Sequence, residues 1–227
     1  EEEIIENIDI GGPSMLRSAA KNFNDVAVVT DINDYAKVLE ELEQGGITYE
    51  TRRALAIKVF NTTASYDAAI ANYFNKKDNL VPERLTLSYK LQDSLRYGEN
   101  PHQKAYHYVQ DNNESYALQN AVQLHGKEMS YNNIQDASAA LDILSEFDET
   151  TCVAVKHMNP CGVATGNSVF EAYSRAYEAD PVSIFGGIVA VNGKVDKETA
   201  EKMHSIFLEI ILATDYDEEA LEILTKK

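Results

Sequence analysis

The strongest constraint on the fold of this chain is the alternation of helical and strand patterns in its C-terminal half. An apolar helical stripe over 136–147 is followed by a short β-branched run, 152–155, which predicts a buried strand. The alternation continues with helices expected from about 168, 196 and 217 and strands over 187–191 and 208–212. Strict alternation of this kind is typical of an α/β layer on a largely parallel sheet, so we predict an α/β fold.

Helical patterns predominate in the N-terminal third. Helices are predicted over 14–21, 33–44 and 48–75, with a single strand over 25–30. One strand is too little sheet to be stable alone, so we expect this segment to be the late part of a domain whose other strands precede it. A polar stretch over 76–84 predicts a domain junction, and strands are predicted beyond it over 85–91, 105–109 and 116–124.

Composition and charge argue against several classes of protein. The 227 residues include 20 basic and 37 acidic side chains, a net charge of −17, whereas a nucleic-acid-binding protein normally has a basic face. No apolar run approaches the roughly eighteen residues that span a bilayer, and the acidic start at Glu1 is unlike a secretory signal. Cys152 and Cys161 are expected on the buried strand and the loop after it, so we predict no disulfide framework and a cytoplasmic location.

Lys156 and His157 directly follow the predicted strand 152–155. In α/β sheets, ligands bind beyond the carboxyl ends of strands, so these side chains are placed for catalysis. Lysine can stabilise an oxyanion, and histidine titrates near neutrality and can move a proton. A solvated strand end is the commoner explanation of an isolated Lys-His pair, but three further polar clusters favour the catalytic one.

Two of these clusters are loops that contain residues suited to binding a nucleotide. Arg96 and Tyr97 can bind a phosphate and stack on a heterocycle, although the glycine and proline around them would also suit a plain turn. The loop 124–136 leads into a helix, whose first amides can bind an anion. N-capping by Asn133 or Asp136 is the alternative, and it does not exclude binding.

The third cluster has glycines before a strand, and a separate N-terminal segment has glycines before a helix. Phe185 and Gly186 precede the strand 187–191, where glycine lets a ligand approach the backbone, although a simple turn also explains them. Near the N-terminus, Asp9 and a glycine pair precede a helix that bears Lys21. Asp9 and Lys21 are either an acid and a base or two charges that match the helix dipole.

The pair Pro160 and Cys161 also suggests the zinc site of deaminases, which use Pro-Cys-x-x-Cys with an upstream His-x-Glu. Ala164 stands where the second cysteine would be, and Asn159 stands where the glutamate would follow His157. A zinc site needs three protein ligands, so we predict that no metal binds here.

Four motifs, 96–103, 124–136, 156–162 and 183–187, occur in this order and together resemble a known family. They are similar to those of the bifunctional purine biosynthesis family, whose members carry an aminoimidazole carboxamide ribonucleotide (AICAR) formyltransferase and an inosine monophosphate (IMP) cyclohydrolase. The segment 9–12, with Arg17 and Lys21, resembles the late part of the cyclohydrolase domain. The resemblance covers essentially the whole chain.

Family members are considerably longer than this chain, so the resemblance implies an internal fragment. It implies that residues 1–80 are the C-terminal part of the IMP cyclohydrolase domain, which has a methylglyoxal-synthase-like fold. Residues 84–227 would be the first cytidine-deaminase-like α/β subdomain of the formyltransferase domain. That subdomain resembles a deaminase without its zinc, in agreement with the missing ligands.

The resemblance also implies roles for individual residues. His157 would take a proton from the 5-amino group of AICAR as it attacks the formyl carbon of 10-formyltetrahydrofolate, the co-substrate. Lys156 would stabilise charge on the formyl oxygen. The substrate-binding positions are Arg96, Tyr97, Asn133, Phe185, Gly186 and Glu209. In the cyclohydrolase site, Asp9 and Lys21 match catalytic positions, and Ile10 and Gly11 match backbone that contacts the nucleotide.

AICAR, formyl-AICAR and IMP are the expected ligands, and a homodimer is expected for the full-length protein, with no nucleic acid, membrane or metal. The fragment itself is expected to be inactive, because each site would lack a part. Two alternatives remain open, a nucleotide-binding fragment without turnover and a zinc-free, deaminase-fold hydrolase of another nucleotide. A binding assay with AICAR distinguishes both from the transferase.

Overall fold

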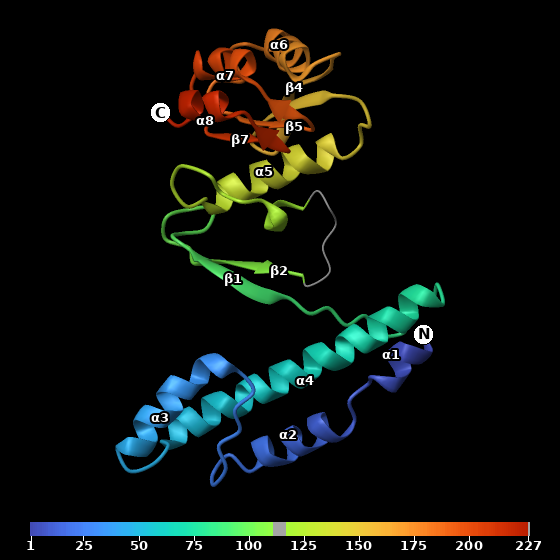
Figure 1. Ribbon diagram of the computed structural model, residues 1–227, viewed down its shortest axis with the longest axis vertical. Helices are drawn as coiled ribbons and strands as arrows, with labels where there is room; N and C mark the ends of the chain where they lie inside the picture. The colour runs from blue at the N-terminus through green and yellow to red at the C-terminus, as the bar shows by residue number, and fades with distance from the viewer. Residues whose placement is uncertain (111–116, 227) are drawn as a thin grey trace. The chain divides into compact units, whose positions relative to one another are not determined.

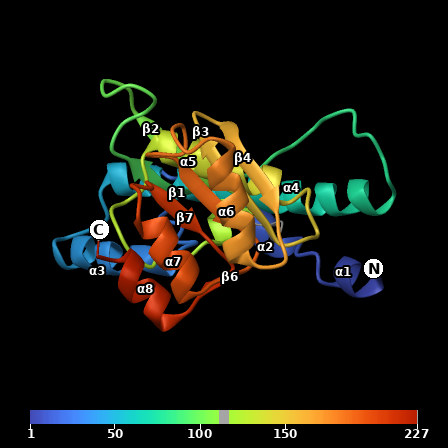
Figure 2. The ribbon, with the colours of Figure 1, turned by 90° about the horizontal axis from the view of Figure 1, so that it is seen from above.

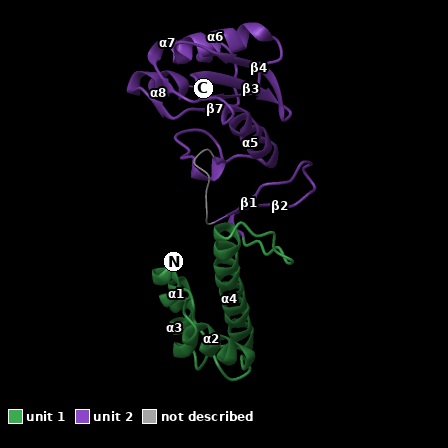
Figure 3. Ribbon diagram, turned by 90° about the vertical axis from the view of Figure 1, so that its right-hand side faces the viewer, with its two compact units in different colours: residues 1–88 green, residues 89–227 purple. Residues whose placement is uncertain are grey.

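The structure is a computed structural model that describes residues 1–110 and 117–226. The chain forms two compact units, unit 1 over Glu1–Ser88 and unit 2 over Tyr89–Lys227 (Figure 3). None of the described helices is both long and apolar enough to cross a bilayer.

Unit 1 is built from helices that pack along one long helix (Figure 1). Its elements are α1 (Glu2–Glu6), α2 (Gly11–Lys21), the 3₁₀ turn η1 (Ile32–Asp34), α3 (Tyr35–Glu43) and α4 (Tyr49–Lys77). Thr48 caps α4 by accepting the Thr51 amide proton, and Glu41 of α3 accepts a hydrogen bond from the Thr51 hydroxyl at 2.6 Å. The buried core between α2 and α4 is small and consists of Ala20, Ala56 and Val59.

The predicted strand over 25–30 is wrong, because these residues follow a turn and continue as irregular backbone. Residues 1–88 contain no strand at all, so the apolar run has no partner for ladder hydrogen bonds. The run still contributes to packing, since Val28 lies against the small core between α2 and α4.

Unit 2 contains a four-stranded sheet with helices on both faces (Figure 2). The sheet order is β4-β3-β5-β7, with bounds β3 (Thr151–Lys156), β4 (Asn159–Thr165), β5 (Ile188–Val191) and β7 (Ile210–Leu212). The helices are α5 (Tyr131–Leu144), α6 (Val169–Ala179), α7 (Lys197–His204) and α8 (Glu218–Leu224). Two small pairs complete the unit, β1 (Lys90–Leu95) with β2 (Ala105–Val109) and β6 (Lys194–Val195) with β8 (Asp215–Tyr216), together with the 3₁₀ turn η2 (Leu118–Asn120).

Strand β3 forms the centre of the core because both of its faces are buried. Successive side chains of a strand point to opposite faces. Val153 and Val155 therefore pack on α5, whereas Cys152 and Ala154 pack in the cluster that contains α6 and α7. A strand covered on both faces reads as a continuous apolar run, which is why 152–155 could be recognised in the sequence.

The prediction of a largely parallel sheet is wrong. Strands β3 and β4 pair antiparallel, as do β3 and β5, and only β5 and β7 run parallel. The residues after β3 do not cross over but turn back at once as β4, so Cys161 lies on a strand and not in a loop. The α/β class is correct, but the sheet is mixed.

Other boundaries differ in smaller ways. The strand 105–109 is confirmed as β2, whereas the strand expected over 85–91 lies at Lys90–Leu95. The strand expected over 116–124 is not found in its described part, where η2 is the regular element; its first residue lies outside the described chain. Helix α5 begins five residues before the expected 136, at Tyr131.

Candidate active site

Several of the predicted transferase residues lie at one edge of the four-stranded sheet. Lys156 ends β3, and Phe185 and Gly186 precede β5. Because β3 and β5 are antiparallel, the end of one lies beside the start of the other, with Val155 opposite Ile188. Strand β7 is parallel to β5, and the amide of Glu209, just before β7, donates to the Gly187 carbonyl at 2.9 Å.

Lys156 is fixed by the backbone of the segment before β5. Its Nζ donates to the Phe185 carbonyl oxygen at 2.8 Å, across 29 positions of sequence. That segment bends sharply, since Gly186 has φ +70° and its amide donates to the Phe207 carbonyl at 2.8 Å. The exposed Phe185 ring lies 5.9 Å from the Phe207 ring. The ammonium of Lys156 is thus held at the sheet edge beside an exposed aromatic ring.

His157 stands in the tight turn that joins β3 to β4. Lys156 pairs with Asn159, so the turn contains only His157 and Met158, with φ values of 54° and 62°. Positive φ at both positions is the type I′ hairpin geometry, which normally uses Asn-Gly. Each side-chain-bearing residue held there costs about 1–2 kcal/mol. Such strain is concentrated at functional sites, and here it presents an exposed imidazole at the same edge as Lys156.

The start of α5 contributes the predicted residue Asn133. Ser130 is the N-cap, and its hydroxyl accepts the Asn133 amide proton, while the Asn133 side-chain oxygen accepts the Ser130 amide proton at 3.0 Å. The expected N-cap at Asn133 or Asp136 is therefore wrong, because Ser130 is the N-cap and Asn133 is its N3 partner in a capping box. Asp136 lies further along the helix, and its carboxylate accepts the Met158 amide proton at 2.7 Å. This contact ties the early part of α5 to the turn that bears His157.

Arg96 and Tyr97 lie just beyond β1, with the Arg96 guanidinium 5.8 Å from the centre of the Tyr97 ring. Backbone bonds close the loop that follows, including that from the Gly98 amide to the Gln103 carbonyl at 2.9 Å. No hydrogen bond, ion pair or ring contact in the described chain joins Arg96 or Tyr97 to Lys156 or His157. A shared pocket for all of these residues stays a prediction.

In unit 1, helix α2 separates the two predicted cyclohydrolase residues. Asp9 accepts the Gly12 amide proton at 3.0 Å just before the helix, and Ile10 and Gly11 are exposed beside it. Lys21 lies in the last turn of this 11-residue helix, about 16 Å along the axis at about 1.5 Å per residue. The structure therefore does not bring Asp9 and Lys21 together, and their positions match the alternative of charges that complement a helix dipole.

Comparison of the sequence with known proteins identifies its family. Residues 19–227 match the family described as the AICARFT/IMPCHase bienzyme. The chain belongs to this family.

The most similar relatives include bifunctional purine biosynthesis proteins PurH from three bacteria. The chain is 60% identical to the PurH of Lysinibacillus sphaericus over 227 residues, which is 100% of this chain and 44% of the relative. It is also 60% identical to the PurH proteins of Lactobacillus acidophilus and Listeria monocytogenes serotype 4a, covering 100% of this chain and 45% of each relative. The chain thus spans less than half the length of the curated relatives it matches.

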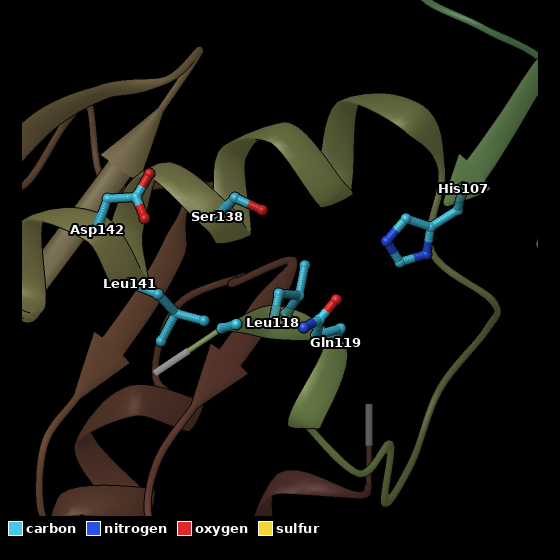
Figure 4. A pocket seen from close by; sticks show the side chains of 7 residues that line it. His107, Leu118, Gln119, Ser138, Leu141 and Asp142 are labelled. Atoms are coloured by element: carbon cyan, nitrogen blue, oxygen red, sulfur yellow. The ribbon is translucent and has the colours of Figure 1, made fainter. Parts of the chain in front are cut away.

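A pocket of about 210 Å³ in this member of the bienzyme family is lined by none of the predicted site residues (Figure 4). Three of its lining side chains come from α5, one from β2, and the others from the segment around η2. The lining residues are His107, Ala117, Leu118, Gln119, Ser138, Leu141 and Asp142. None of them was singled out in the sequence, because a strand histidine and helix-surface polar residues give no distinguishing pattern.

The two thiols of this family member are poorly suited to nucleophilic catalysis or metal binding. Burial raises the pKa of Cys152 to about 12, and burial also raises the pKa of Cys161. Both therefore stay protonated near neutrality, whereas a nucleophile or metal ligand must be a thiolate. No group of three or more His, Cys, Asp and Glu side chains suited to a metal ion occurs in residues 1–110 and 117–226.

Proposed function

We propose that the protein to which this chain belongs transfers a formyl group from 10-formyltetrahydrofolate to AICAR and then cyclises the product to IMP. Membership of the bienzyme family supports the proposal, as do relatives that are named bifunctional purine biosynthesis proteins. The observation that carries it is the sheet edge where Lys156 bonds to the Phe185 carbonyl and the adjacent His157 is exposed.

His157 acts as the general base in this proposal. The 5-amino nitrogen of AICAR attacks the formyl carbon, and His157 accepts the proton that this nitrogen loses. The bond from the formyl carbon to the folate nitrogen then breaks, and the proton passes to that nitrogen. An exposed imidazole at a turn can meet both substrates, since neither of its ring nitrogens is hydrogen-bonded within the described chain.

Lys156 stabilises the negative charge that develops on the formyl oxygen. Its ammonium donates one hydrogen bond to the Phe185 carbonyl, which fixes its position, and keeps other N–H groups for the substrate. A cation that is already in place when the charge appears lowers the barrier without reorganisation.

The nucleotide is held by groups from several elements. Arg96 is exposed beyond β1, and its guanidinium donates two hydrogen bonds to the phosphate. Tyr97 and Asn133 bind the rest of the ribonucleotide. The exposed Phe185 and the glycine after it border the base. Glu209 supplies a carboxylate at the start of β7.

The second activity, cyclisation of formyl-AICAR, belongs to unit 1. Asp9 and Lys21 are proposed as catalytic groups there, with Ile10 and Gly11 at the nucleotide. Because α2 separates Asp9 from Lys21, they act at different parts of the ligand or with residues outside this chain. In the proposed assignment, residues 1–80 are the C-terminal part of a methylglyoxal-synthase-like domain, and residues 84–227 are the first cytidine-deaminase-like subdomain. The protein is further proposed to be a cytoplasmic, metal-independent homodimer.

The test uses a full-length protein that carries this segment. His157→Ala is expected to lower formyl transfer by about 10²–10⁴-fold while AICAR binding persists, because a positioned general base contributes about that much. Lys156→Ala is expected to act similarly, and cyclisation of supplied formyl-AICAR should survive both changes. Rates are measured with each substrate separately.

His204→Ala, a change of a histidine on α7, is the matched control and should leave formyl transfer intact. Full formyl transfer by His157→Ala would show that the catalytic assignment is wrong. AICAR binding without any transfer by the unaltered protein would favour the non-enzymatic alternative.

A further inference from the structure

The carboxylate of Asp136 contacts the turn that presents His157. Its Oδ1 accepts the backbone N–H of Met158 at 2.7 Å, joining α5 to the β3–β4 hairpin across 22 positions of sequence. Within the described residues, the other side-chain hydrogen bond to the turn runs from Asn159 Nδ2 to the His157 carbonyl at 2.7 Å and comes from the hairpin itself. Among the described residues, Asp136 on α5 is therefore the one side chain from outside the hairpin that forms a hydrogen bond with this turn.

The turn needs to be held because neither of its residues is glycine. His157 and Met158 both have positive φ, a region that L-residues with a Cβ adopt at a steric cost. Without an external bond, the turn can relax toward backbone conformations in which the imidazole points elsewhere. A hydrogen bond to the Met158 amide fixes the peptide that joins the two strained residues, and hence the direction of the His157 side chain.

Two ordinary roles for Asp136 do not explain its position. It is the sixth residue of α5, beyond the first turn where a carboxylate caps amides or complements the helix dipole. Ser130 and Asn133 already cap the helix. Asp136 also forms no ion pair with the described cations, so its role here is that of a hydrogen-bond acceptor.

We infer that Asp136 is a positioning residue for His157: its bond to the Met158 amide keeps the strained turn in the conformation that places the imidazole beside Lys156. This inference rests on the proposed role of His157 in formyl transfer. It predicts that the acceptor oxygen matters and the negative charge does not. It also predicts that removing the strain removes the need for the bond.

Four variants of a full-length protein that carries this segment test the inference. Asp136→Ala removes the acceptor, and Asp136→Asn keeps a side-chain oxygen without the charge. The double change Asp136→Ala with Met158→Gly removes the acceptor but puts a residue at 158 that accepts positive φ freely. Asp142→Ala is the matched control, since it makes the same change on the same helix away from the turn.

We expect Asp136→Ala to lower kcat for formyl transfer by about 10–100-fold with little change in the KM for AICAR, because a small misplacement of a catalytic group is costly. Asp136→Asn should stay within about threefold of the unaltered protein, and the double variant should recover most of the lost kcat. Amide hydrogen exchange at residue 158, measured for the same proteins, should become faster in Asp136→Ala and stay unchanged in Asp142→Ala.

The combined readouts separate failure of the inference from failure of the proposed function. If His157→Ala is itself fully active, the proposed function is wrong, whatever the exchange data show. If His157→Ala is inactive while Asp136→Ala keeps its kcat despite faster exchange at 158, the positioning role is wrong. Loss of activity in Asp136→Asn equal to that in Asp136→Ala would also overturn it, because the charge would then be the important feature.

Discussion

At the scale of single residues, burial sets the acid–base behaviour of the core of unit 2. Cys152 is completely buried between the sheet and α6, and the pKa of its thiol rises to about 12 because the thiolate cannot be solvated there. Burial likewise raises the pKa of Tyr216 to about 12, and it also raises the pKa of Tyr173. These groups are neutral in the folded protein over a wide range of pH.

This burial predicts that the chain loses stability in alkali. The thiol of an unfolded cysteine has a pKa of about 8.5, whereas burial raises the pKa of Cys152 in the folded protein to about 12. Between those values the unfolded state binds fewer protons, so the free energy of unfolding falls as pH rises, by up to about 1.4 kcal/mol per pH unit for this one thiol.

Cys152→Ala should flatten this dependence between pH 9 and 10.5, as measured by urea unfolding at several pH values. The half-buried Cys161 serves as the control position, and Cys161→Ala should change the slope less. If the free energy of unfolding falls equally steeply with pH in the unaltered protein and in Cys152→Ala, the loss of stability in alkali does not come from the Cys152 thiol.

At the scale of elements, three of the four described α-helices of unit 2 begin at residues whose side chains accept a hydrogen bond from a first-turn amide. Ser168 accepts the Glu171 amide proton at the start of α6, and Asp196 accepts the Thr199 amide proton at 2.8 Å at the start of α7. Asp217 stands at the same position of α8 but makes no such bond. The sequence predicted the starts of α6, α7 and α8. Only the structure shows which of these three cap residues form a hydrogen bond with a first-turn amide.

This difference predicts unequal effects of two matched substitutions. Asp196→Ala should lower the free energy of unfolding by about 1 kcal/mol, since it removes a cap hydrogen bond. Asp217→Ala should cost less, because it removes only an exposed contact with Lys194. Urea unfolding of both variants gives the comparison. A larger loss for Asp217→Ala would show that the cap bond of α7 contributes little.

At the scale of the whole molecule, the two units have unequal cores. The buried cluster of unit 1 has three residues, and many of its large apolar side chains are exposed, including Leu39 and Leu42 of α3. The sheet of unit 2 is covered on both faces by buried clusters. Local stability follows the amount of apolar surface buried around an element.

Native-state hydrogen exchange should therefore differ between the units. The amides of α2 should exchange at least about tenfold faster than those of β3, because less buried surface is exposed when unit 1 opens. Mass spectrometry of the 227-residue chain after timed exchange measures both segments in one sample. Equal protection of α2 and β3 would show that the small core is not the limit on unit 1.

Sequence patterns identified the strands whose residues are apolar and buried. They missed a strand whose residues are typical of loops. The apolar run of β3 was predicted, but β4 contains Asn159, Pro160 and Gly162, which look like loop residues. Pro160 is tolerated because β4 is an edge strand with an irregular register there. Gly162 serves close packing, since a Cβ at this position would lie 2.2 Å from the Ala176 carbonyl of α6.

The same limit applies to the site. The sequence placed Lys156 and Phe185 in separate clusters, and the structure joins them by a hydrogen bond. The sequence indicates Asp136 only as a possible helix cap, because its partner in the structure is a backbone amide on a hairpin 22 positions away. Such a contact depends on the folded positions of two elements and leaves no periodic pattern in either.

The two-residue turn between β3 and β4 also has a consequence for the order in which unit 2 folds. A hairpin normally forms early, because its contacts are close in sequence and cost little chain entropy to close. Here the turn is unfavourable until the Asp136 carboxylate arrives from α5. We therefore expect this hairpin to close only when the helix docks, so that a pairing that is local in sequence becomes a late and cooperative step of folding.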